Sequence, residues 1–235
     1  MNYKRNSKYF KSLSLPPKGW MAFIVIIGIL FAVKPVFGIL GLILFCAVIW
    51  GIYSGKPSDA EIDAQLDALM NGLEQQALRK LGLDEEEVKI APPLFLKSYS
   101  FGGSVLKDKA NQKLCDKQGK DGYWRSPECV LTAWFFTEEQ IYHYVKYASL
   151  VSDSKKETTD EVFYKDVVSV KTDTSERPLI DPKTGKESLT EKYTETQFIL
   201  RNTGGEVIAD ACDTSESAEE AVRAMRSLLK QKKMA

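Results

Sequence analysis

The sequence contains few of the residues that carry most metal and redox chemistry. Of its 235 residues one is a histidine, His143, and four are cysteines with no CxxC pair: Cys46, Cys115, Cys129 and Cys212. A zinc site needs three or four nitrogen or sulfur ligands at a workable spacing, which this pattern does not offer. Cys115 and Cys129 flank a polar loop and would pair in an oxidising compartment, although thiols in a reducing compartment are the favoured interpretation. We expect no metal and no cofactor.

Short motifs of familiar enzymes are also missing. The chain has no GxxxxGK[ST] loop, no GxGxxG, no HExxH and no GxSxG. His143 is the only candidate imidazole base, and it stands among aromatic residues of an expected strand, where cross-strand packing is the favoured role. Catalysis by paired carboxylates stays open, because distance along the sequence does not report distance in space. We predict that the protein is not an enzyme and has no catalytic residue.

Excess charge of one sign is absent as well. The 32 lysines and arginines balance the 32 aspartates and glutamates, which gives a formal net charge of zero. Nucleic-acid-binding proteins carry a basic surface, and no overall basic excess exists here. We expect no nucleic acid among the partners.

One long apolar run, residues 20–53, dominates the N-terminal part. A single helix through it would be about 50 Å long, whereas the hydrocarbon core of a bilayer is about 30 Å thick. Lys34 and Pro35 divide the run, and proline disfavours an unbroken helix. Trp20, Trp50 and Tyr53 would then meet at one interface. The pattern predicts a two-helix transmembrane hairpin, and its length argues against a cleaved signal peptide.

The first 19 residues form a basic arm without acidic residues. Its cations are Lys4, Arg5, Lys8, Lys11 and Lys18. The positive-inside rule places this arm in the cytoplasm, and a hairpin returns the chain to the same side. We therefore predict a cell-membrane protein with two spans and both termini cytoplasmic. The cations either contact anionic headgroups or only set the topology, and the sequence leaves both open.

Residues 54–89 are expected to form an amphipathic helical linker. Ser58 and Glu61 have the spacing of a capping box, apolar residues follow at helical spacing from Ile62 to Leu81, and Gly82 is a natural stop. The apolar stripe packs either on its own domain, which is favoured, or on a partner helix.

Residues 90–235 have a sequence pattern typical of an antiparallel β domain followed by one amphipathic helix. Strands are predicted over 94–101, 129–137, 140–150, 161–171, 193–201 and 206–211, with the last two joined at Gly204 and Gly205. The aromatic residues at 134–147 divide between the two faces of the sheet, and we expect the linker helix to cover one of those faces. The predicted fold class is α+β, an antiparallel barrel or sandwich capped by the C-terminal helix.

Three features of this region belong together: the segment from Tyr164 through Asp166 to Val170, the hairpin from Phe198 to Gly205, and the final helix from Ala218. In combination they resemble the pleckstrin-homology superfold, in particular bacterial PH-like and GRAM-like domains. The resemblance covers roughly residues 94–232. It implies a binding or scaffolding module, although a shared fold does not transfer a function. The insertion at 178–187 and the lack of a phosphoinositide-type basic motif depart from the pattern.

The combined prediction is a membrane-anchored, non-enzymatic scaffold at the cytoplasmic face. Residues 20–53 would contact membrane lipids, and the soluble domain would bind a protein partner or a second copy. The alternative is sensing of anionic lipid by the basic arm together with one loop. The third hypothesis is that the protein is an enzyme of unfamiliar type. That loop is either a contact site or an ordinary solvated loop, and its candidate residues are Lys117, Lys120, Tyr123, Trp124 and Arg125.

Overall fold

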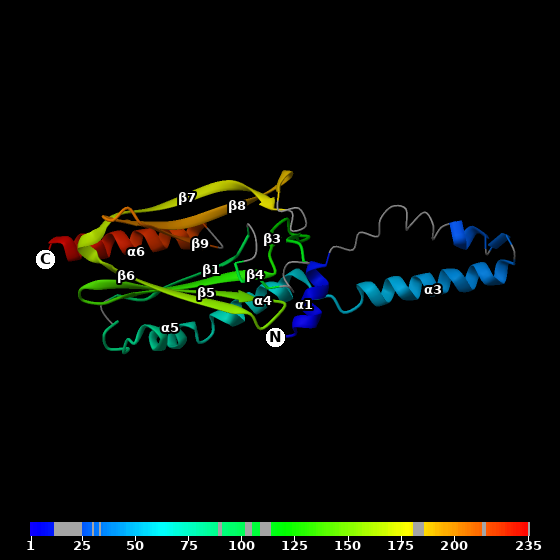
Figure 1. Ribbon diagram of the computed structural model, residues 1–235, viewed down its shortest axis with the longest axis horizontal. Coiled ribbons are helices and arrows are strands. Elements are labelled where there is room, and N and C mark those ends of the chain that lie inside the picture. The colour runs from blue at the N-terminus through cyan, green and yellow to red at the C-terminus, as the bar shows by residue number, and fades with distance from the viewer. Residues whose placement is uncertain are drawn as a thin grey trace.

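The computed structural model describes residues 1–11, 25–29, 31–32, 34–88, 91–101, 105–108, 114–180, 186–212 and 215–234. Two β-sheets and the helices on them form one body, and a long helix projects from one end of it (Figure 1). The protein is α+β. All four cysteines are thiols.

The helices with defined bounds before the sheets are α1 (Tyr3–Phe10), α3 (Pro35–Tyr53), α4 (Asp59–Met70) and α5 (Leu73–Leu81). The capping box that begins α4 is confirmed, since Ser58 and Glu61 bond each other's backbone. The expected single helix from Ser58 to Leu81 is two helices. Gly72 has a φ of 77°, a left-handed conformation that a continuous helix cannot contain.

A four-stranded antiparallel sheet forms the centre of the body, in the order β1-β4-β5-β6. Its strands are β1 (Leu94–Tyr99), β4 (Glu128–Phe136), β5 (Gln140–Ser149) and β6 (Lys155–Phe163). Most of the residues between the predicted strands 140–150 and 161–171, expected to be a charged loop, belong to strand β6. Most β6 side chains are exposed, and its order comes from pairing with β5 rather than from an alternating pattern.

The other strands make a short ribbon and a second sheet. The ribbon pairs β2 (Lys117–Gln118) with β3 (Trp124–Arg125), and the second sheet has the order β7-β8-β9. Its strands are β7 (Val167–Ile180), β8 (Glu187–Asn202) and β9 (Val207–Cys212), followed by α6 (Ser215–Met234). The hairpin at Gly204 and Gly205 is confirmed, with Gly205 at a φ of 80°. Residues 181–185, in the predicted insertion, lie outside the described residues.

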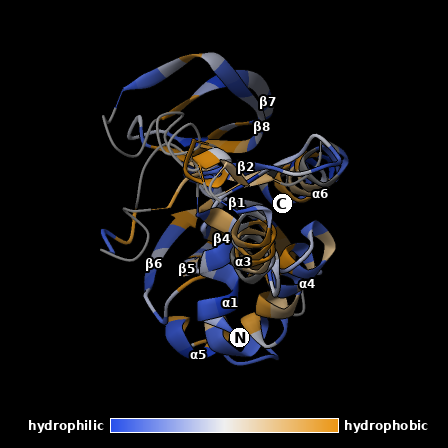
Figure 2. Ribbon diagram, turned by 90° about the vertical axis from the view of Figure 1, so that its right-hand side faces the viewer, coloured by the Kyte–Doolittle hydropathy of each residue, from blue (hydrophilic) through white to orange (hydrophobic). Residues whose placement is uncertain are grey.

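Two apolar cores lie on opposite faces of the central sheet. Leu131, Ala133 and Phe135 pack with α1, α4 and α5 on one face. Trp134 and Phe136 pack with the second sheet and α6 on the other. The helices therefore cover one face of the aromatic strands, as expected from the alternation of β4 (Figures 1 and 2).

The predicted PH-like barrel is wrong. The described strands form two separate open sheets and the two-stranded ribbon, and no ladder joins β6 to β7 or β1 to β9. The segment that suggested one PH-like strand is divided by the 3-10 turn η2 (Tyr164–Asp166). This turn takes the chain out of the central sheet at Phe163 and into the second sheet at Val167, so the two sheets stack and no barrel closes.

The predicted transmembrane hairpin is also wrong. No helix in the described part of the chain is both long and apolar enough to cross a membrane. Lys34 is extended and Pro35 begins α3, so the apolar run is divided. The predicted two-span localisation with cytoplasmic termini depended on this hairpin and is overturned with it. Trp20 lies outside the described residues.

Candidate functional site

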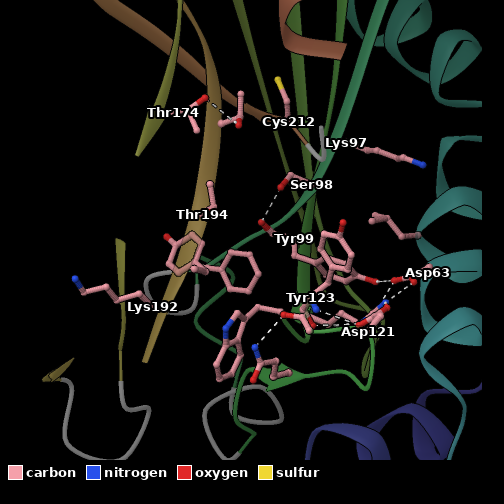
Figure 3. A pocket seen from close by; sticks show the side chains of 18 of the residues that line it. Asp63, Lys97, Ser98, Tyr99, Asp121, Tyr123, Thr174, Lys192, Thr194 and Cys212 are labelled. Carbon is pink, nitrogen blue, oxygen red and sulfur yellow. Dashed lines mark hydrogen bonds and ion pairs between the residues drawn. The ribbon is translucent and has the colours of Figure 1, made fainter. Parts of the chain in front are cut away.

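A cleft of about 860 Å³ opens where the two sheets diverge (Figure 3). The end of β1, the β2–β3 ribbon, helix α4 and the first half of β8 form its walls, and Thr174 of β7 and Cys212 of β9 lie at its inner end. These segments are far apart in the sequence. Ligand sites in proteins typically occupy such concave spaces of 300–1,000 Å³.

Aromatic rings from three separate segments form part of the cleft walls. Phe101 follows β1 and packs on Tyr193 of β8 with ring centroids 4.3 Å apart, and Tyr99 lies 6.4 Å from Phe101. Tyr123 and Trp124 come from the ribbon, and the side chain of Tyr123 is 72 % exposed. Large, stiff rings of this kind supply contact area at low cost in conformational entropy.

Arg125 holds the ribbon wall in place. The residue is 3 % exposed, and its guanidinium donates two bonds to Asp63 of α4 (2.8 and 2.6 Å) and two to Asp121 (3.0 and 2.6 Å). It also donates to the carbonyl oxygen of Tyr123 at 3.2 Å. Bidentate bonding on two sides fixes the ribbon against α4 and sets the direction of the two neighbouring aromatic residues.

Neighbouring tyrosines extend this network to α1 and β1. The Tyr99 hydroxyl donates to Asp63 at 2.7 Å, and the Tyr9 hydroxyl donates to Asp59 at 2.6 Å. Burial and these carboxylates raise the pKa of both tyrosines. The bond from Arg125 lowers the pKa of Asp121 to about 2. The pair of Arg125 and Asp121 is therefore ionised throughout the physiological pH range.

Charges on the cleft walls compensate one another. Asp67 pairs with Lys97, and Lys192 lies 3.8 Å from Glu176 of β7. With Arg125 already bonded to Asp63 and Asp121, no ionic group dominates the lining. The cleft is best suited to apolar side chains and to a neutral hydrogen-bonding backbone.

The residues of the predicted interaction loop separate into two groups with different positions. Tyr123, Trp124 and Arg125 line the cleft, whereas Lys117 and Lys120 do not. The Lys117 ammonium lies 3.6 Å from the centre of the Tyr9 ring, and the Lys120 backbone donates to Asp59 at 2.8 Å. The two lysines thus join the ribbon to α1 and α4.

The predicted basic arm is largely an integral helix. Within α1, Tyr9 and Phe10 are buried in the core, and Arg5 donates two bonds to Glu61 at 2.8 and 3.0 Å. Lys4 and Lys11 are exposed and Lys8 is partly exposed, while Lys18 lies outside the described residues. The arm therefore packs on α4, but most of its lysines take no part in this contact.

Replacement of Asn6 by alanine is expected to lower the free energy of unfolding by about 2 kcal/mol. Asn6 is fully buried, donates to the carbonyl oxygen of Leu150 at 2.6 Å and exchanges bonds with Gln65. Its loss leaves those partners unsatisfied. Urea unfolding followed by circular dichroism measures the change, and the exposed Lys4→Ala is the matched control. Equal stability of both variants would show that α1 is not a structural part of the body.

His143 lies away from the cleft, in the core between the sheets. It is 2 % exposed; its Nδ1 is 3.2 Å from Asp160 of β6, and its Nε2 is 3.0 Å from Asp210 of β9. The indole of Trp134 also donates to Asp210, at 2.7 Å. Burial opposes the charged imidazole, but the bonds to Asp160 and Asp210 outweigh it and raise the pKa of His143 to about 9. At neutral pH this group is an imidazolium that joins the two sheets.

Comparison with known proteins identifies no relative. No protein-family model matches the chain, and neither the curated proteins nor the solved structures contain a match. The resemblance to PH-like domains has no support from these comparisons.

Sequence reasoning missed the cleft residues outside the ribbon. Tyr99, Phe101 and Tyr193 stand in or beside predicted strands, where alternation alone assigns an aromatic residue to a core face. The signal that was available is the polar neighbourhood of Tyr193, which is the only large apolar residue in the sequence between positions 190 and 197.

Proposed function

We propose that this protein is a non-enzymatic binding module that holds a segment of a partner protein in the aromatic cleft. The observation that carries the proposal is the cleft itself, about 860 Å³ in volume, with aromatic walls brought together from the end of β1, the ribbon and β8. Aromatic residues, buried arginine and a polar rim are the composition that recurs at sites where proteins bind one another.

The way in which the cleft walls are held in place favours a binding role over a catalytic role. Arg125 is bonded to two carboxylates and is thereby committed to fixing the ribbon. His143 is not one of the residues that line the cleft. A rigid aromatic surface with few uncommitted polar groups suits recognition of a partner by shape and apolar contact.

Site-specific photocrosslinking tests the proposal. A benzophenone amino acid at position 123, on the exposed rim of the cleft, is expected to crosslink one partner polypeptide in cells of the native host. The matched control places the same group at position 189, where Leu189 is 95 % exposed and does not line the cleft. Mass spectrometry identifies the crosslinked chain and tells a different protein from a second copy.

Trp124→Ala should reduce the yield of the crosslink at position 123 at least fivefold, since a central aromatic contact carries much of the binding energy of a typical interface. Lys165→Ala, which alters an exposed residue away from the cleft, should leave it unchanged. Equal crosslinking from positions 123 and 189, or none from position 123, would contradict a protein-binding role for the cleft.

A further inference from the structure

Strand β8 is paired along only part of one side. Strand β7 pairs with Lys192–Asn202 and with Glu187 on one side, but β9 pairs only with Thr196–Arg201 on the other. Among the described strands, none pairs with residues 192–195 on the β9 side. Lys192, Tyr193 and Thr194 of this stretch line the cleft.

In residues 192–195, every second residue directs its backbone N–H and C=O groups to the side of β8 on which β9 and the cleft lie. The Asn202 N–H donates to the Glu206 carbonyl at 3.1 Å, which marks a hydrogen-bonded pair at the start of the β8–β9 ladder. Hydrogen-bonded and non-hydrogen-bonded pairs alternate in an antiparallel ladder. Thr196 and Cys212, which lie opposite each other, therefore form a hydrogen-bonded pair. Continued along β8, the same alternation directs the N–H and C=O of Thr194 and Lys192 to the side of β9.

A side-chain contact on the other edge of β8 agrees with this assignment. The hydroxyls of Thr174 and Thr196 lie 3.2 Å apart across the β7–β8 ladder. Side chains approach most closely in non-hydrogen-bonded pairs. The N–H and C=O of Thr196 accordingly face β9 rather than β7, and those of Thr194, two residues away, face the same side.

The opposite wall of the cleft is also formed at a sheet edge. Strand β1 is the edge strand of the central sheet, and it runs beside β9. Beyond Cys212, where β9 ends, the aromatic rings of Tyr99, Phe101 and Tyr193 line the space between the two edges. Figure 3 shows Thr194 and Tyr99 on opposite sides of this space.

We propose that the partner binds as an added β-strand. An extended peptide segment continues the line of β9 and forms main-chain hydrogen bonds with Lys192 and Thr194. Its side chains alternate, so that every second one is apolar and lies against Tyr99, Phe101 and Tyr193. Open strand edges are templates for this mode of recognition. The inference rests on the proposed function and specifies the chemistry of the partner.

Peptide selection on the full chain tests strand addition. A phage library of random twelve-residue peptides is selected, and the most enriched peptide is synthesised and titrated by fluorescence anisotropy. Thr194→Pro removes the N–H directed into the cleft and should weaken binding about tenfold or more. Thr194→Val keeps that N–H and should weaken binding much less than Thr194→Pro does, because only the side chain differs.

Binding that Trp124→Ala weakens and Thr194→Pro leaves unchanged would overturn strand addition while keeping the cleft as the binding site. Binding that neither substitution affects, or no enriched peptide at all, would overturn the proposed function as well. Hydrogen exchange of the unmodified chain gives a second measurement that does not depend on the folding of Thr194→Pro. The amides of Lys192 and Thr194 should exchange fast alone and at least tenfold more slowly with peptide, whereas protection without peptide would overturn the proposal.

Discussion

Replacement of Arg125 by methionine is expected to lower the free energy of unfolding by about 3 kcal/mol, because removing one member of a buried ionic cluster leaves its partners uncompensated. The guanidinium is 3 % exposed and bonds Asp63 and Asp121 at 2.6–3.0 Å. Both carboxylates are partly exposed and can recover water, which places the effect at the lower end of the range for such clusters. Urea unfolding followed by tryptophan fluorescence measures the loss.

Arg125→Lys is the control that separates charge from geometry. Lysine keeps the positive charge but cannot form two bidentate pairs, so its stability should lie between those of wild type and Arg125→Met. Because Trp124 and Tyr123 depend on Arg125 for their position, both variants should also lose affinity for the selected peptide. A Met variant within 0.5 kcal/mol of wild type, on the scale of ordinary surface substitutions, would show that the cluster does not stabilise the ribbon.

The second large effect is a loss of stability at alkaline pH that depends on His143. The pKa of His143 rises from 6.5 to about 9 on folding, so the folded state binds the proton more tightly. The resulting stabilisation is fully present below pH 6.5 and disappears as the pH rises through about 9. This difference in pKa corresponds to about 3 kcal/mol. Asp160, whose pKa is lowered chiefly by its bond with His143, contributes stability that is lost as the pH falls through its lowered value.

His143→Gln is the matched variant for this measurement, because the amide is polar but does not titrate. The difference in unfolding free energy between wild type and His143→Gln should be largest near pH 6 and fall by about 3 kcal/mol by about pH 10, where only the difference between a neutral imidazole and an amide is left. Urea unfolding at steps of one pH unit provides both curves. Parallel curves over this range would show that His143 carries no proton at neutral pH, and that its contacts with Asp160 and Asp210 are those of a neutral ring.

Local features of the fold follow from local sequence. The capping box at Ser58, the left-handed glycine that ends α5 and the hairpin at Gly205 are each set by a few adjacent residues, and each lies where the sequence predicts it. Alternation along β4 likewise assigns Trp134 and Phe135 to opposite faces of the sheet, each buried in a different core. These features depend on interactions between near neighbours, which the sequence displays directly.

Predictions that required distant contacts failed. The packing of the arm on α4 could not be predicted, because its lysines are visible in the sequence, whereas the buried bonds of Asn6 to Gln65 and Leu150 are not. Strand β6 was missed because its charged residues pair with β5 through the backbone. The barrel was wrong because a three-residue turn at Tyr164 sends the chain into a second sheet.

By itself the sequence determined the secondary-structure elements with strong local signals, the lack of familiar catalytic motifs, and the ribbon residues Tyr123, Trp124 and Arg125 as candidates. Only the tertiary structure decided that these three residues meet Tyr99, Phe101 and Tyr193 in one cleft. It also decided that β9 pairs with Thr196–Arg201 of β8, so that none of the described strands pairs with residues 192–195 on that side. The reason is physical: hydrogen-bond register and side-chain packing between segments many residues apart depend on the global arrangement of the chain, which no local pattern encodes.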